Sequence, residues 1–240
     1  MSANQVLSAA GIPMISYASN SPALSDDDEF PLFYRVLPSD AIQGPAGVAM
    51  MLDAGVTNES LAILHMTNDY GFGLADSIKS AWEVNGELCS AGMQGYDETA
   101  SEFSGLVSAI IDDENCEAVY LSSFQTDAAG IIEELHNQGW DGQIFAGDGA
   151  SGSDLYGQMT DHSMLEGVTV TSPRESVSYG DFEQRYDDNA EEVGGIKYFA
   201  LTAYDSTMIL GKAIAEYDEH HELTDSIEPV SYTHLTLPTN

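Results

Sequence analysis

Basic residues are scarce in this chain of 240 residues, since 6 Lys and Arg stand against 40 Asp and Glu for a formal net charge of -34. This charge repels phosphate backbones, which excludes nucleic acid as a partner. The acids are scattered among periodic apolar segments, which favours a folded core inside an acidic shell over disorder. Self-repulsion on this scale is tolerable where molar salt reduces the Debye length to about 3 Å, so we interpret the protein as salt-adapted, as in a halophile.

Long apolar runs and cysteines are also rare. No run approaches the roughly 18 residues of a membrane helix, and no charged segment followed by an apolar one opens the chain. Cys89 falls in an expected strand and Cys116 in a loop before another strand. Their spacing does not settle whether they pair, and we expect two unrelated thiols.

Sequence motifs of common enzyme classes are missing as well. The chain has no G-x-S-x-G, no G-x-x-x-x-G-K-[ST], no H-E-x-x-H and no C-x-x-C. The series Gly71, Gly73 and Asp76 lacks the third glycine of a dinucleotide fingerprint. We therefore expect no catalytic residue, no cofactor and no metal site.

What is present is an alternation of short apolar runs with longer helical segments, which is typical of βαβ units. Strands are predicted at 13–16, 33–37, 60–66, 87–91, 117–122, 143–147 and 166–173. Helices are predicted at 2–10, 40–54, 72–85, 102–113, 126–138, 153–159, 179–193 and 199–219. Consecutive β/α units of this kind predict an α/β fold with a parallel sheet.

Two segments have the composition of connectors between lobes, namely 35–44 and 170–176. The last residues, 230–240, contain no charged residue except a protonatable His234. They resemble the translated read-through of a sequencing adapter, so we expect a non-native tail there and a fragmentary chain.

Four loops follow predicted strands, where parallel α/β sheets bind their ligands. Each loop has a plainer interpretation as a turn or a helix cap. The candidate ligand-binding residues in these loops are Ala18, Ser19, Asn20, Tyr70, Ser122, Phe124 and Asp148.

The segments "SAN" (2–4), "GIPMISYASNSPAL" (11–24), "FYRVLPSDAIQG" (33–44), "NDYGFG" (68–73) and "AYDS" (203–206) occur in this order. Together they resemble the substrate-binding proteins of branched-chain amino acid (Leu/Ile/Val-type) ABC transporters over residues 1 to about 219. The resemblance implies a type I periplasmic-binding fold, in which two Rossmann-like lobes with parallel sheets are joined by three crossings and close on a small ligand.

The same resemblance implies how the chain divides. Residues 1–38 would be the remainder of an N-terminal lobe whose first strands are absent, and 39–172 would be the C-terminal α/β lobe. Residues 173–229 would return to the N-terminal lobe as helices. A further carboxylate-binding serine would precede Met1, so we expect weak or no amino acid binding by residues 1–240.

By resemblance, Ala18 and Asn20 bind the carboxylate and ammonium groups of an amino acid, although members usually have Thr in place of Asn20. Asp148 binds the ammonium group where many members have Glu. Tyr70 lines the cleft, and Phe124, where some members have Tyr, packs on the ligand. Ser122 is chosen only because it neighbours this loop in sequence.

The resemblance implies a non-catalytic, extracytoplasmic receptor that delivers a branched-chain or related amino acid to an ABC permease. It would associate with the membrane only through an anchor, such as a lipid, attached to a segment that precedes residue 1. Two alternatives stay open: the same fold could bind urea, an amide or an aromatic acid, or the chain could be the ligand-sensing ectodomain of a signalling receptor. An α/β enzyme is the outside alternative.

Overall fold

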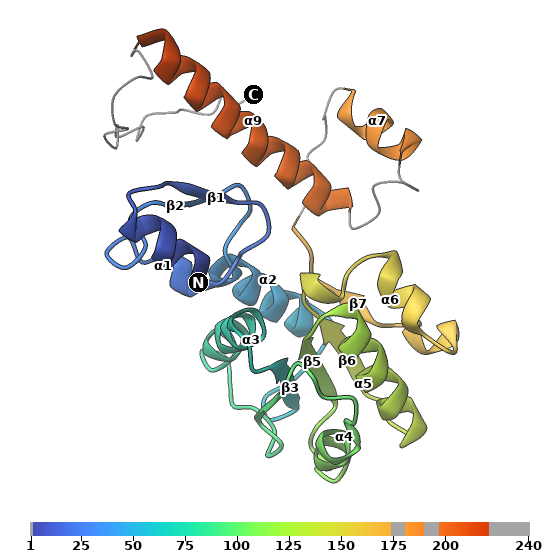
Figure 1. Ribbon diagram of the computed structural model, residues 1–240. Coiled ribbons are helices and arrows are strands. Elements are labelled where there is room, and N and C mark those ends of the chain that lie inside the picture. Colours follow the sequence, from blue (N-terminus) through green and yellow to red (C-terminus); the bar gives the residue numbers. More distant parts are fainter. Residues whose placement is uncertain (1, 174–180, 190–196, 221–240) are drawn as a thin grey trace.

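The computed structural model describes residues 2–173, 181–189 and 197–220, and its strands form two parallel sheets (Figure 1). The smaller sheet pairs β1 (Met14–Ser16) with β2 (Phe33–Arg35). The larger sheet has the order β4-β3-β5-β6-β7, with β3 (Leu61–Met66), β4 (Met93–Tyr96), β5 (Ala118–Ser122), β6 (Gln143–Ala146) and β7 (Thr169–Val170).

The α-helices are α1 (Ser2–Ala9), α2 (Asp40–Asp53), α3 (Asp69–Trp82), α4 (Ser104–Ile111), α5 (Gln125–Asn137), α6 (Ser153–Gln158), α7 (Phe182–Asp188) and α9 (Lys197–His220). Short 3-10 turns are η1 (Pro22–Ser25), η2 (Asp148–Ala150) and η3 (His162–Leu165). This order matches the predicted alternation of strands and helices.

The larger sheet is buried on both faces, which accounts for the unbroken apolar runs of its central strands. Every residue of β3 and β5 is buried. Because side chains alternate along a strand, Leu61 and Ile63 pack among residues of α2 and α3, whereas Leu64 and Met66 pack among residues of α4 and α5. Helices therefore cover both faces of the sheet (Figure 1).

The strand predicted at 87–91 is misplaced, since β4 begins at Met93. Residues 89–92 form a turn instead, in which the Gly92 N–H donates to the Cys89 carbonyl at 2.9 Å. Gly92 has φ 65°, a left-handed conformation that glycine adopts without steric cost. The segment predicted as a strand therefore leads into a turn, and β4 comes after it.

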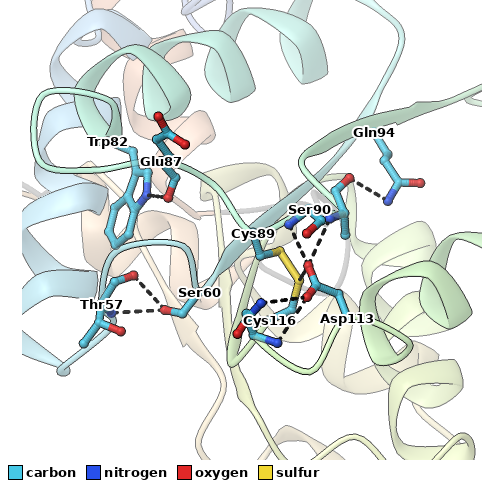
Figure 2. Close-up of a disulfide and its surroundings, with 11 residues drawn as sticks. Thr57, Ser60, Trp82, Glu87, Cys89, Ser90, Gln94, Asp113 and Cys116 are labelled. Carbon is cyan, nitrogen blue, oxygen red and sulfur yellow. Dashed lines mark hydrogen bonds between the residues drawn. A yellow bond between two sulfur atoms is a disulfide. The ribbon is translucent and has the colours of Figure 1, made fainter.

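The expectation of two unrelated thiols is wrong, because Cys89 and Cys116 form a disulfide with Cα atoms 5.4 Å apart (Figure 2). Both cysteines lie beside the amino end of β3: the Cys89 N–H donates to the Leu61 carbonyl, and the residue after Cys116 donates to the Ser60 carbonyl. The pairing of strands thus brings together two residues that are 27 positions apart.

The two-stranded sheet lies with α1 and α9 at one end of the molecule, away from the larger sheet (Figure 1). The Thr202 hydroxyl of α9 donates to the Tyr17 carbonyl at 2.7 Å, so α9 is tied to the loop after β1. Of the predicted return segment 173–229, residues 174–180, 190–196 and 221–229 lie outside the described residues, as does the tail 230–240. Within the described ranges, no helix combines the length and apolar character that crossing a bilayer requires.

Candidate functional site

The candidate site forms where loops leave the carboxyl ends of parallel strands. The loop after β3 starts α3, with Asn68 as its N-cap: the Asn68 side-chain oxygen accepts from the Gly71 N–H at 2.8 Å. This cap sets Tyr70 in the first turn of α3, facing the loop after β6. That second loop continues as η2, which starts with Asp148.

Asp148 is the centre of the site, with 2% of its surface exposed. Its Oδ2 accepts from Nδ2 of Asn20 at 3.1 Å, and its Oδ1 accepts from the Tyr70 hydroxyl at 3.0 Å and from Nε2 of Gln43 at 3.2 Å. Burial raises the pKa of Asp148, while the hydrogen bonds from Tyr70 and Gln43 oppose that rise. Three chain segments distant in sequence therefore hold one buried carboxyl group.

Tyr70 links the two loops. Its hydroxyl donates to Asp148 and accepts from the Gly149 N–H at 2.8 Å. Burial raises the pKa of Tyr70 well above its usual value, so the hydroxyl stays a neutral donor. The Tyr70 ring stacks on Phe124 with centroids 5.2 Å apart and planes 3° apart, and Phe124 remains 48% exposed. An accessible aromatic face thus lies beside the buried carboxyl group.

Gln43 is a site residue that sequence reasoning missed. Besides Asp148, its Nε2 donates to the Thr171 hydroxyl oxygen at 3.1 Å, and this hydroxyl also lies 3.2 Å from the Tyr120 hydroxyl. Gln43 and Thr171 belong to the two segments, 35–44 and 170–176, that composition identifies as connectors. The signal was available, because Gln43 stands in the segment "FYRVLPSDAIQG" that carries part of the family resemblance.

Asp40, in the first turn of α2, is the other missed residue. It is 0% exposed, and neither carboxyl oxygen has a hydrogen-bond partner among the described residues. Burial raises the pKa of Asp40 to about 7, the charge of Asp148 raises it as well, and Arg35 lowers it. The Asp40 backbone N–H donates to the Asn20 carbonyl at 2.9 Å, which connects it to the loop after β1.

Ala18, Ser19 and Ser122, the remaining predicted residues, do not take part in the hydrogen bonds that hold the Asp148 carboxyl group. The N–H groups of Ala18 and Ser19 donate to the Ser16 hydroxyl oxygen at 3.3 and 2.8 Å, so these amides serve the turn itself. Ser122, at the end of β5, is fully buried, and its hydroxyl has no partner among the described residues. Hydrogen bonds and ring stacking join four of the predicted residues, namely Asn20, Tyr70, Phe124 and Asp148, and their contact with a ligand stays a prediction.

Metal binding finds little support in the described part of the chain. Ligand atoms of Cys89, Asp113 and Cys116 lie within 4.8 Å of one another. Both sulfurs are bonded to each other, however, so neither is a thiolate (Figure 2). The Asp113 carboxylate instead accepts from the backbone N–H of Ser90 at 2.6 Å, which fixes the turn beside the disulfide.

Comparisons with known proteins agree with this architecture. The family described as "Receptor family ligand binding region" matches residues 2–236. A leucine-, isoleucine-, valine-, threonine- and alanine-binding protein of Pseudomonas aeruginosa is 23% identical over 218 residues, covering 87% of this chain and 55% of that protein. Human metabotropic glutamate receptor 8 is 28% identical over 170 residues, covering 69% of this chain and 18% of the receptor.

Among solved structures, a leucine-binding protein from Thermotoga maritima superposes with a TM-score of 0.73 at 23% identity, covering 88% of this chain and 59% of that one. The predicted α/β fold with parallel sheets, of the type I periplasmic-binding kind, is confirmed. The chain spans between about a fifth and three fifths of the length of these relatives, which are binding proteins and receptors and not enzymes. The chain belongs to the family of receptor ligand-binding regions.

Proposed function

We propose that the chain is the ligand-binding part of an extracytoplasmic receptor that binds a branched-chain or related amino acid and delivers it to an ABC permease. The observation that carries this proposal is the buried Asp148 carboxyl group, held by Asn20, Gln43 and Tyr70 from separate segments. A carboxylate fixed in this way suits an ammonium group. Such a charge-assisted hydrogen bond contributes about 1.5–3 kcal/mol.

The rest of the ligand would meet surfaces of two kinds. The Phe124 ring is half exposed and rigidly stacked on Tyr70, which suits an aliphatic side chain. Asn20 and the backbone carbonyls of Ala18 and Ser19, whose N–H groups already serve the turn, would contact the polar head group, and Ser122 lies at the end of the neighbouring strand. The name of the Pseudomonas relative, which includes leucine, isoleucine and valine, supports an amino acid of this class.

The Cys89–Cys116 disulfide supports a location outside the cytoplasm, because structural disulfides persist in oxidising compartments and are rare in the cytosol. We also propose the division into lobes at 1–38, 39–172 and 173–229. It is supported by the five-stranded sheet between residues 61 and 170 and by the return of α9 to the loop after β1.

A second candidate is the ectodomain of a signalling receptor. The similarity to human metabotropic glutamate receptor 8 favours it, and the buried carboxyl group would serve the ammonium of any amino acid. The two candidates share the same binding site and differ in the step after ligand binding, which is transfer to a permease in one and signalling in the other.

Ligand-observed NMR in molar KCl tests the proposed site on the 240-residue chain itself, because it detects weak binding. The panel is L-leucine, L-isoleucine, L-valine, L-alanine, L-threonine, L-glutamate and urea. We expect an aliphatic amino acid to give the strongest signal and Asp148→Asn to weaken its binding by about tenfold or more, the loss of one charge-assisted hydrogen bond.

Asp154→Asn is the matched control, since Asp154 is an exposed acid on α6. It should bind as the wild type does. Equal binding by the wild type and Asp148→Asn would remove Asp148 from the site, and binding of urea without binding of any amino acid would contradict the proposed function.

A further inference from the structure

The backbone of Asp40 makes its hydrogen bonds, whereas its carboxyl group makes none with the described residues. Its N–H donates to the Asn20 carbonyl, and its own carbonyl accepts from the Ser77 hydroxyl at 2.8 Å. Both carboxyl oxygens are buried and lack a hydrogen-bond partner among the described residues. An ionised carboxylate in this position would lose its hydration without gaining donors, which is strongly unfavourable, whereas the protonated form is neutral.

The charged groups around Asp40 do not reverse this cost. Arg35 on β2 is the nearby cation, but its guanidinium donates to the Ser21 carbonyl and the Ser25 hydroxyl, not to Asp40. From η2, Asp148 contributes a negative charge that raises the pKa of Asp40 further.

Two tyrosines face the same region, Tyr70 from α3 and Tyr120 from β5, and burial raises the pKa of both, so they stay neutral. The amino end of α2 favours the ionised form of Asp40. Burial and Asp148 nevertheless outweigh Arg35, since the pKa of Asp40 still lies at about 7.

The carboxyl groups of Asp148 and Asp40 differ in the hydrogen bonds that they accept. Asp148 accepts hydrogen bonds from Asn20, Gln43 and Tyr70, whereas Asp40 accepts none on its side chain from the described residues. Asp148 therefore ionises first, because hydrogen-bond donors stabilise its negative charge. An ionised Asp40 would have no such donor and would be repelled by the charge of Asp148.

We propose that Asp40 is a proton-binding site coupled to Asp148, so that the ligand-free pair carries one negative charge, on Asp148, and one proton, on Asp40. A cationic group placed beside the pair would favour the second ionisation, and the Asp40 proton would then pass to solvent. This second step rests on the proposed function. It makes capture of an ammonium group stronger as the pH rises through neutrality.

The proton site is tested on the ligand-free chain by NMR of aspartate carboxyl carbons labelled with carbon-13. We expect one carboxyl resonance to titrate near pH 7 and to be missing from Asp40→Asn. Asp148→Asn should move that titration to lower pH, because it removes one negative charge while keeping a similar shape. Titration of Asp40 below about pH 5, or no response to Asp148→Asn, would overturn the proposal.

Asp127→Asn is the matched control. Burial raises the pKa of Asp127 too, but its side chain faces Tyr96 and Glu98, so the variant should leave the Asp40 titration unchanged. A shift as large as that caused by Asp148→Asn would show a general charge effect and would also overturn the coupling.

The coupling between ligand binding and release of the Asp40 proton is tested by calorimetry with L-leucine at neutral pH in two buffers of different ionisation enthalpy. We expect the wild type to release part of a proton per leucine bound and Asp40→Asn to release none. Binding without proton release by the wild type would overturn the linkage. Failure of every variant to bind leucine would agree with the weak or absent binding expected of residues 1–240 and would not bear on Asp40, because the NMR titration of the ligand-free chain decides whether Asp40 holds the proton.

Discussion

Replacing Asp40 by Asn should stabilise the protein at neutral pH and have little effect in acid. The pKa of Asp40 is about 7 in the folded chain against 3.8 for an unperturbed group, a difference of about 3 units. Between these values the folded state holds a proton that the unfolded state has lost, so wild-type stability falls as the pH rises. At 1.36 kcal/mol per unit, the fall amounts to about 4 kcal/mol.

Asn at position 40 does not titrate, so the difference in unfolding free energy between Asp40→Asn and the wild type should grow with pH. Somewhat more than half of the effect should develop between about pH 5 and about pH 8, where urea denaturation in molar salt is practical. The fluorescence of buried Trp82 reports unfolding. A difference that stays constant over this pH range would refute the reasoning, because an ordinary carboxyl group at position 40 would give that result.

Three further predictions concern packing, the disulfide and salt. Gly149→Ala should destabilise the fold by about 1–3 kcal/mol in chemical denaturation, because an added Cβ would lie 2.6 Å from the Tyr70 hydroxyl oxygen, whereas Gly157→Ala, which meets nothing within 4 Å, should not. Equal effects would show that the close approach is unimportant. Replacing Cys89 and Cys116 together by Ser should cost about 3.5 kcal/mol, since the disulfide closes a loop between positions 27 apart, and reductant should lower the melting temperature of the wild type but not of the variant. The melting temperature should rise as KCl increases to molar concentrations, since the net charge is -34, and a melting temperature independent of salt would contradict salt adaptation.

The fold could be predicted closely because its signals are local. The runs at 60–66 and 117–122 are apolar throughout most of their length, and the structure contains β3 and β5 there. Asn68 caps α3, which begins at Asp69, three residues earlier than the predicted start at 72, a usual uncertainty of helix boundaries. The strand predicted at 87–91 is wrong because its composition does not show that a turn closes at Gly92.

The candidate site could be predicted only in part. Tyr70, Phe124 and Asp148 follow strands of the larger sheet, and the rule that such loops meet at one edge of a parallel sheet identifies those loops. Asn20 follows β1 of the smaller sheet, and the family resemblance identified it. Gln43 lies inside a helix, so no loop rule selects it. Its role appears only through its contacts with Asp148 and Thr171, which are 105 and 128 positions away in sequence.

By itself, the sequence determined the acidic surface, the alternation of strands and helices and the loops that could bind a ligand. These properties depend on composition and on patterns that repeat over a few residues. The tertiary structure alone decided that Cys89 pairs with Cys116, that Gln43 reaches Asp148 and that the Asp40 carboxyl group is buried without a donor among the described residues. Each of these depends on how segments far apart in the chain are placed by strand pairing and helix packing, because hydration and hydrogen bonding of a side chain are set by its neighbours in space.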